Sequence, residues 1–178
     1  MKTLFIHPYD PSTEFLHIVY DRHADNSDVT IINGEKLNKI KRKEFIKAIK
    51  DNDRIVIMGH GTEYGLLDMI RKRYVITPNE VQFIKDKEVI CYWCNANIFV
   101  EKYDLNAFST GMFVSEIDEA KWYKLPTEQE LIDESNTLFC EILSSCIFDS
   151  LEIIHDRINN EYIGDNPIIK FNRECMGI

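Results

Sequence analysis

The chain has 178 residues, of which 44% are hydrophobic and 29% are charged, and its formal net charge is −9. A chain of this length can bury a full core without disulfides or metals, so we expect a single domain over residues 1–178. The acidic balance argues against general nucleic-acid binding. No apolar run approaches the roughly 18 residues of a membrane helix, and the N-terminus turns polar too quickly for a signal peptide, so we expect no membrane contact.

The cysteines form an odd set of five, without the spacing of a secreted disulfide framework. Reduced thiols are therefore favoured over disulfide bridges, and this predicts a cytoplasmic protein. The cysteines are Cys91, Cys94, Cys140, Cys146 and Cys175.

The first third of the chain alternates short apolar runs with helical patterns. Residues 2–7 are predicted to form a strand, and the turn over residues 8–11 leads into a helix that Ser12 or Thr13 can cap and that runs to about His23. Runs rich in Ile and Val are typical of buried strands in a parallel sheet. The following elements are a strand over residues 29–32, a basic amphipathic helix over residues 36–50 and a strand over residues 54–58.

Helix signals are clearer in the rest of the chain. Thr77 can cap a helix that continues to about Lys87, with Pro78 at the first helical position and Glu80 three residues after the cap. We then expect a strand over residues 89–93, a short helix to about Tyr103 and a strand over residues 108–114. A long helix from Thr127, a second helix over residues 150–162 and a docked tail over residues 168–178 complete the prediction.

This alternation predicts an α/β fold. We expect a mostly parallel sheet of four to six strands with right-handed crossovers, helices on both faces and a helical C-terminal third.

A histidine and a cysteine that can take part in catalysis each stand at the end of an apolar run. His60 and Gly61 close the run over residues 53–61, and Cys94 closes the run over residues 88–94. Ligands and reactions in parallel sheets collect at the carboxyl ends of the strands. If the two strands are neighbours, the thiol and the imidazole share one crevice, as a cysteine nucleophile and its histidine partner require.

These two blocks resemble those of the caspase-like (clan CD) cysteine peptidases, which include caspases, gingipains, clostripain and CHAT domains. The resemblance covers about residues 53–116. It departs from the caspase pattern at Asn95, where caspases carry arginine and glycine after the cysteine. The resemblance implies a caspase-like three-layer sandwich and a thiol protease acting on a peptide or protein substrate, without a cofactor or a metal.

The resemblance also implies residue roles. Cys94 would attack a carbonyl, and His60 would protonate the leaving amine and then activate water. The backbone N–H groups of Gly61 and Cys94 would surround the oxyanion, each worth about 3 to 4 kcal/mol to the transition state. Gly61 fits because a residue without Cβ lets a substrate backbone approach closely.

Other residues are candidates for substrate binding. His7 and Asp10 follow the first strand on the same edge of the sheet, although the prolines there can simply enforce a turn. Acidic residues after the last strand would favour Lys or Arg in a substrate, or they can stabilise a helix N-terminus. The remaining candidates are Thr62, Asn95, Ser115, Glu116, Asp118 and Glu119.

Several alternatives stay open. Cys91 and Cys94 form a C-x-x-C pair, but on a strand positions three apart point to opposite faces, which argues against redox or zinc chemistry. The chain can instead be a non-catalytic caspase-like or Rossmann-like domain that binds a small, nucleotide-like ligand at the strand ends. The segment from Lys36 to Lys50 carries seven basic residues against Glu44 alone, either as a solvated helix face or as a docking patch for an acidic partner.

Overall fold

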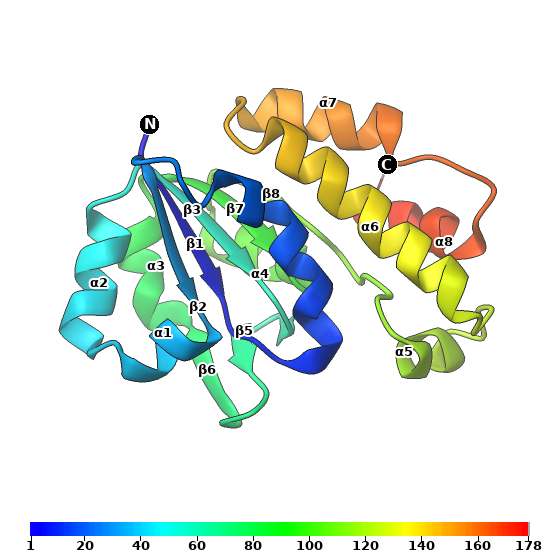
Figure 1. Cartoon of the computed structure of the whole chain (residues 1–178), viewed down its shortest axis with the longest axis horizontal. Coiled ribbons are helices and arrows are strands. Elements are labelled where there is room, and N and C mark those ends of the chain that lie inside the picture. Colours follow the sequence, from blue (N-terminus) through cyan, green and yellow to red (C-terminus); the bar gives the residue numbers. More distant parts are fainter. Residues whose placement is uncertain (178) are drawn as a thin grey trace.

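The computed structural model describes residues 1–177 and contains a central sheet of five strands in the order β2-β1-β3-β7-β8 (Figure 1). All of its strand pairs are parallel. The strands are β1 (Thr3–His7), β2 (Val29–Asn33), β3 (Arg54–Met58), β7 (Glu88–Tyr92) and β8 (Ala107–Ser109).

Side chains that alternate along each strand divide the core between the two faces of the sheet. On β3, Ile55 and Ile57 pack with helices α1, α2, α3 and α4, whereas Val56 and Met58 pack with η1 and with the C-terminal helices α6, α7 and α8. Figure 1 shows the same arrangement of layers. The predicted α/β architecture, a mostly parallel sheet between two helical layers, is therefore confirmed, as is the helical C-terminal third.

The helices cover both faces and begin at recognisable signals. Thr77 caps α3 and Ser150 caps α7 through their side chains, as the sequence predicts for Thr77. The helices are η1 (Pro11–Val19) and η2 (Asp21–His23), both of 3₁₀ type, and α1 (Gly34–Lys39), α2 (Arg42–Lys50), α3 (Pro78–Ile84), α4 (Ala96–Tyr103), α5 (Ile117–Trp122), α6 (Gln129–Cys146), α7 (Leu151–Glu161) and α8 (Pro167–Met176).

A second, antiparallel sheet in the order β4-β5-β6 was not predicted. Its strands are β4 (Gly61–Thr62), β5 (Gly65–Asp68) and β6 (Arg73–Ile76). They are too short to show alternation, and the sheet depends on close backbone approach: a Cβ on Gly65, whose φ is +135°, would lie 2.0 Å from the carbonyl oxygen of Ile76. The run that was expected to present Gly61 to a substrate instead turns into this sheet.

Three predicted elements differ in detail. The single basic helix over residues 36–50 is two helices, because the backbone is extended at Ile40 and Lys41 and the carboxylate of Glu44 accepts a hydrogen bond from the Lys41 N–H. The first helix is of 3₁₀ type and is capped by Asp10, not by Ser12 or Thr13.

The last strand also ends earlier than predicted, at Ser109. Beyond it, the carbonyls of Thr110 and Gly111 accept hydrogen bonds from the N–H groups of Asn97 and Asn95. These carbonyls thus accept hydrogen bonds from N–H groups at the start of α4, which have no partner within the helix, and they do not extend the sheet.

Within residues 1–177 no helix is both long and apolar enough to span a membrane. All five cysteines are free, and Cys140 and Cys146 are buried in the core beneath α6.

Candidate functional site

The crevice of interest lies where the strand order of the main sheet reverses. From β1 the chain passes to β2 on one side and then to β3 on the other, so β1 and β3 flank the topological switch point. Ligands of open α/β sheets bind outside the carboxyl ends of the strands at such a point. A small hollow there is lined by residues of η1, of the end of β7 and of the segments after β3, β7 and β8: Thr13, Phe15, Leu16, Gly59, His60, Tyr92, Trp93, Cys94, Phe113 and Ser115.

A cluster of three polar side chains joins the loops after β1 and β3. Ser12 Oγ lies 2.6 Å from Asp10 Oδ1 and 2.7 Å from His60 Nε2. His60 Nε2 is also 3.5 Å from Asp10 Oδ1. Asp10 occupies this position because it caps η1, accepting a hydrogen bond from the Ser12 N–H at 3.0 Å.

Asp10 and His60 of this cluster favour each other's charged forms. The hydrogen bond to Asp10 raises the pKa of His60 despite the opposing effect of burial. Burial alone would raise the pKa of Asp10, but the hydrogen bonds from His60 and Ser12 outweigh it and lower this pKa to about 2. His60 is therefore protonated more readily than a free imidazole, and it lies beside a carboxylate whose ionised form is favoured.

This geometry does not form a relay for a serine nucleophile. In such a relay the carboxylate binds one imidazole nitrogen and the serine binds the other. Here both Asp10 and Ser12 contact Nε2 of His60. Asp10 favours the protonated form of His60, which cannot accept the serine proton, so the arrangement suits hydrogen-bond donation to a ligand better than base catalysis.

Cys94 is close to the same crevice but has different partners. Its Sγ lies 3.5 Å from the Phe113 carbonyl oxygen and 3.8 Å from Glu119 Oε1. Burial, followed by the charge of Glu119, raises the pKa of Cys94 to about 12. At pH 7 the thiolate is then on the order of one part in 10⁵, so the thiol is a donor and a poor nucleophile.

The expected pairing of Cys94 with His60 is only partly realised. Their strands, β3 and β7, are neighbours with Met58 opposite Tyr92, and both residues line the crevice. Among the described residues, however, no hydrogen bond joins the thiol to the imidazole, which is committed to Asp10 and Ser12. Cys91 packs on the opposite face of the sheet from the Phe113 cluster that Cys94 contacts, which argues against joint C-x-x-C chemistry.

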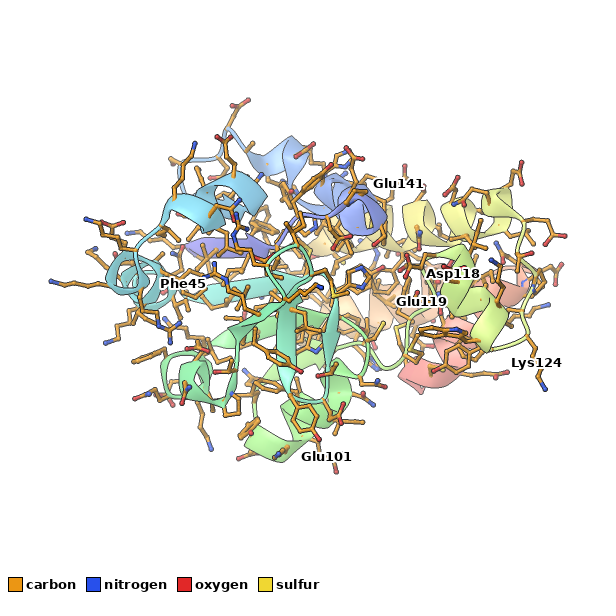
Figure 2. All side chains as sticks on the ribbon, turned by 90° about the horizontal axis from the view of Figure 1, so that it is seen from below. Phe45, Glu101, Asp118, Glu119, Lys124 and Glu141 are labelled. Carbon is orange, nitrogen blue, oxygen red and sulfur yellow. The ribbon has the colours of Figure 1, made fainter. Side chains whose placement is uncertain are left out.

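The acidic residues after β8 separate into two groups. Glu119 is buried and accepts hydrogen bonds from Ser115, at 2.8 Å from its N–H and 3.3 Å from its Oγ. Burial raises the pKa of Glu119. Asp118, which Figure 2 labels beside Glu119, is exposed and pairs with Lys121. The charge of Glu116 contributes to raising the pKa of His60.

The other expected site residues have structural partners. His7 is buried and hydrogen-bonds Tyr20 and Thr13, and Thr62 accepts a hydrogen bond from the Trp93 indole through its carbonyl. Asn95 adopts a left-handed conformation, with φ of 64°, at the start of α4.

Gly61 is needed for a different reason from the predicted one. A Cβ at this position would lie 2.1 Å from the Trp93 ring, so the close approach is to that ring and not to a substrate backbone. Sequence reasoning missed Ser12 as a contact of His60, and it did not foresee the contact between Glu119 and Cys94.

Neither the scan against protein-family models nor the search of curated proteins returned a match. Among solved structures, the chain is similar to one named "flavone reductase", with a TM-score of 0.44 and 12% sequence identity. The match covers 84% of this chain and 64% of that one, so this chain spans less than two thirds of the length of that structure.

The predicted resemblance to caspase-like cysteine peptidases is wrong, and with it the thiol-protease interpretation. The similar solved structure is named as a reductase and not as a peptidase. The site agrees with this correction, because the Cys94 thiol has a raised pKa and its neighbour is a carboxyl group.

The charge state of His60 can be tested directly. Asp10→Asn removes the carboxylate that favours the protonated imidazole, so we expect the pKa of His60 to fall. Titration of the histidine ring protons by NMR in the two proteins measures this shift. An unchanged pKa of His60 would mean that Asp10 is not its principal partner.

Proposed function

We propose that this chain is a binding domain for a small neutral molecule that carries a carbonyl oxygen and an apolar body. The observation that supports this most strongly is the position of His60 at the switch-point crevice, where Asp10 favours its protonated form. Its Nε2 is committed to Ser12 and Asp10, whereas its Nδ1 has no hydrogen-bond partner in the part of the chain that the structure describes. A protonated imidazole donates from both nitrogens, so one charge-assisted donor is unused.

The size of the hollow favours a small acceptor group. Its free volume is about 20 Å³, which is enough for about one water molecule. A carbonyl oxygen can take the place of that water, while the rest of the ligand lies across the open mouth of the crevice. The walls suit an apolar body, since Phe15, Leu16 and Phe113 line the hollow beside His60.

The surrounding charges favour a neutral ligand over an anion. The cation of His60 is balanced by Asp10 at 3.5 Å, and Glu116 and Glu119 add negative potential at the imidazole. This negative potential would repel a carboxylate or phosphate, whereas it would not repel a neutral carbonyl group.

A nucleotide-like ligand is less well supported than a neutral one. A phosphate is usually held by free N–H groups at a helix N-terminus. Here Pro8 and Pro11 lack N–H groups, and the carboxylate of Asp10 already occupies the start of η1.

Benzamide is a suitable probe because it combines a neutral carbonyl group with an apolar ring. We expect binding with a dissociation constant on the order of 1 mM, as is usual for a ligand of this size, and benzoate and benzylamine should bind more weakly. His60→Phe should weaken benzamide binding by about tenfold, since it removes the charged donor. The affinity should also fall as the pH rises through the elevated pKa of His60.

The matched control is His155→Phe, which changes an exposed histidine on α7. Calorimetry gives the affinities, and circular dichroism checks that each variant is folded. Equal binding of benzoate and benzamide, or unchanged affinity in His60→Phe, would contradict the proposal.

We further propose a cytoplasmic location, because free cysteines, including the partly exposed Cys175, are typical of reducing compartments.

A further inference from the structure

A second feature lies between the helices α1 and α2 and the hairpin of β5 and β6. One hollow of about 130 Å³ is lined by Leu37, Ile40, Arg42, Phe45, Arg73, Tyr74 and Val75. A second hollow of about 230 Å³ shares Leu37 and continues along the hairpin past Ile70 and Arg71. We call this pair of hollows the hairpin groove; Figure 2 labels Phe45 on its α2 side.

The hairpin groove combines an apolar floor with a basic rim. Leu37, Phe45 and Val75 are buried beneath it, while Ile70 is 60% exposed at the hairpin tip. An exposed apolar surface of this kind, bordered by charged residues, marks interaction sites more often than ordinary surface. The basic residues that line the two hollows are Arg42, Arg71 and Arg73, and the acidic ones are Glu35 and Asp68.

Buried carboxylates hold the arginines of the rim in place. Glu80, whose side chain is 2% exposed, pairs with Arg42. Asp68, whose side chain is 3% exposed, pairs with Arg71 at 3.1 Å and lies 3.8 Å from Arg73. Each guanidinium has five donors, and the side chains of Arg42 and Arg73 remain more than half exposed, so donors stay available on the solvent side.

We propose that the hairpin groove binds an extended protein segment in which acidic residues alternate with apolar ones. Charge complementarity supports this occupant, because the three arginines are partly exposed at the groove whereas their partners Asp68 and Glu80 are buried. The apolar side chains enter the hollows, and the carboxylates bind the pre-oriented arginines. β6 is the outer strand of its sheet, paired only with β5 among residues 1–177, and such edges recurrently accept an extended peptide.

A fluorescein-labelled peptide of alternating leucine and glutamate tests this proposal by fluorescence anisotropy. We expect saturable binding that weakens at high salt, and Arg73→Gln should weaken it by about tenfold, as expected for loss of a charged contact near the centre of an interface. In this variant Asp68 still pairs with Arg71, so the hairpin retains an ion pair. Arg22→Gln, at an exposed arginine on η2, is the matched control and should bind as the unmodified chain does.

Two further peptides separate the contributions of charge and apolar contact: lysine in place of glutamate, and serine in place of leucine. Neither should bind. Equal binding of the lysine peptide, or no effect of Arg73→Gln, would overturn the proposal. It would also fail if sedimentation of the protein alone showed self-association that Arg73→Gln abolishes, because the occupant would then be a second copy. His60→Phe should leave peptide binding unchanged, so this test is independent of the crevice.

Discussion

Arg54→Ala is expected to lower the free energy of unfolding by about 2 to 3 kcal/mol. The Arg54 side chain is only 1% exposed, although it carries a full charge. Its Nε lies 3.1 Å from Glu88 Oε2, and its guanidinium also donates to the carbonyl of Ile147, the residue after α6. The side chain thus joins the start of β3 to β7 and to the helical layer.

The cost arises because truncation leaves two acceptors without their donor. The Glu88 carboxylate is partly exposed and can regain water, but the carbonyl of Ile147 is bound by a buried guanidinium. Urea denaturation measures the change, and Arg22→Ala, at an exposed position, should stay within about 0.5 kcal/mol of the unmodified chain. A loss below about 1 kcal/mol for Arg54→Ala would show that water replaces these contacts.

The parallel sheet was predictable because each of its central strands is a short run of Ile and Val with charged or turn residues at its ends. β3 begins at Arg54 and ends at Met58, as expected, and β1 and β7 differ from their predicted bounds by one residue. The second sheet was not predictable from such runs. Its strands depend on the contact of Gly65 with the Ile76 backbone, which exists only after the chain has folded back.

The candidate site was likewise predictable only in part from the sequence. Local sequence placed His60, Cys94 and Asp10 at the carboxyl edge, and the structure brings them to one region because parallel strands end together. Which groups become partners depends on packing between loops. The contact of Ser12 with His60 spans 48 positions in the sequence, and that of Cys94 with Glu119 spans 25, so no local pattern reports them. A single domain over residues 1–178 stays a prediction.

Acidification is expected to destabilise the protein through His7, which is buried beneath the crevice. Burial lowers the pKa of His7 from 6.5 to about 4, despite the opposing charge of Asp10. Its ring nitrogens lie 3.1 Å from Tyr20 Oη and 3.3 Å from Thr13 Oγ1, both neutral groups. The protonated imidazole of His7 is therefore less stable inside the protein than in water.

The direction of the pH effect follows from proton binding in the two states. Between pH 6.5 and about 4 the unfolded chain binds a proton at His7 that the folded chain does not, so stability falls as the pH is lowered through this window. A difference of about 2.5 pKa units corresponds to about 3 kcal/mol, complete once the pH is below 4. The ion pair of His60 is fully formed below pH 6.5 and weakens only at higher pH, so it does not add to this loss.

His7→Gln isolates the contribution of this one side chain. Glutamine can hydrogen-bond Tyr20 and Thr13 but does not titrate, so the difference in unfolding free energy between the two proteins should shrink by about 3 kcal/mol as the pH falls from 6.5 to 4. Groups common to both proteins cancel in this difference, including Glu119, whose raised pKa acts in the opposite direction. Urea denaturation of both proteins at a series of pH values measures this difference in unfolding free energy. Parallel pH profiles for the two proteins would mean that His7 has the same pKa in the folded and unfolded states, so that burial does not lower it.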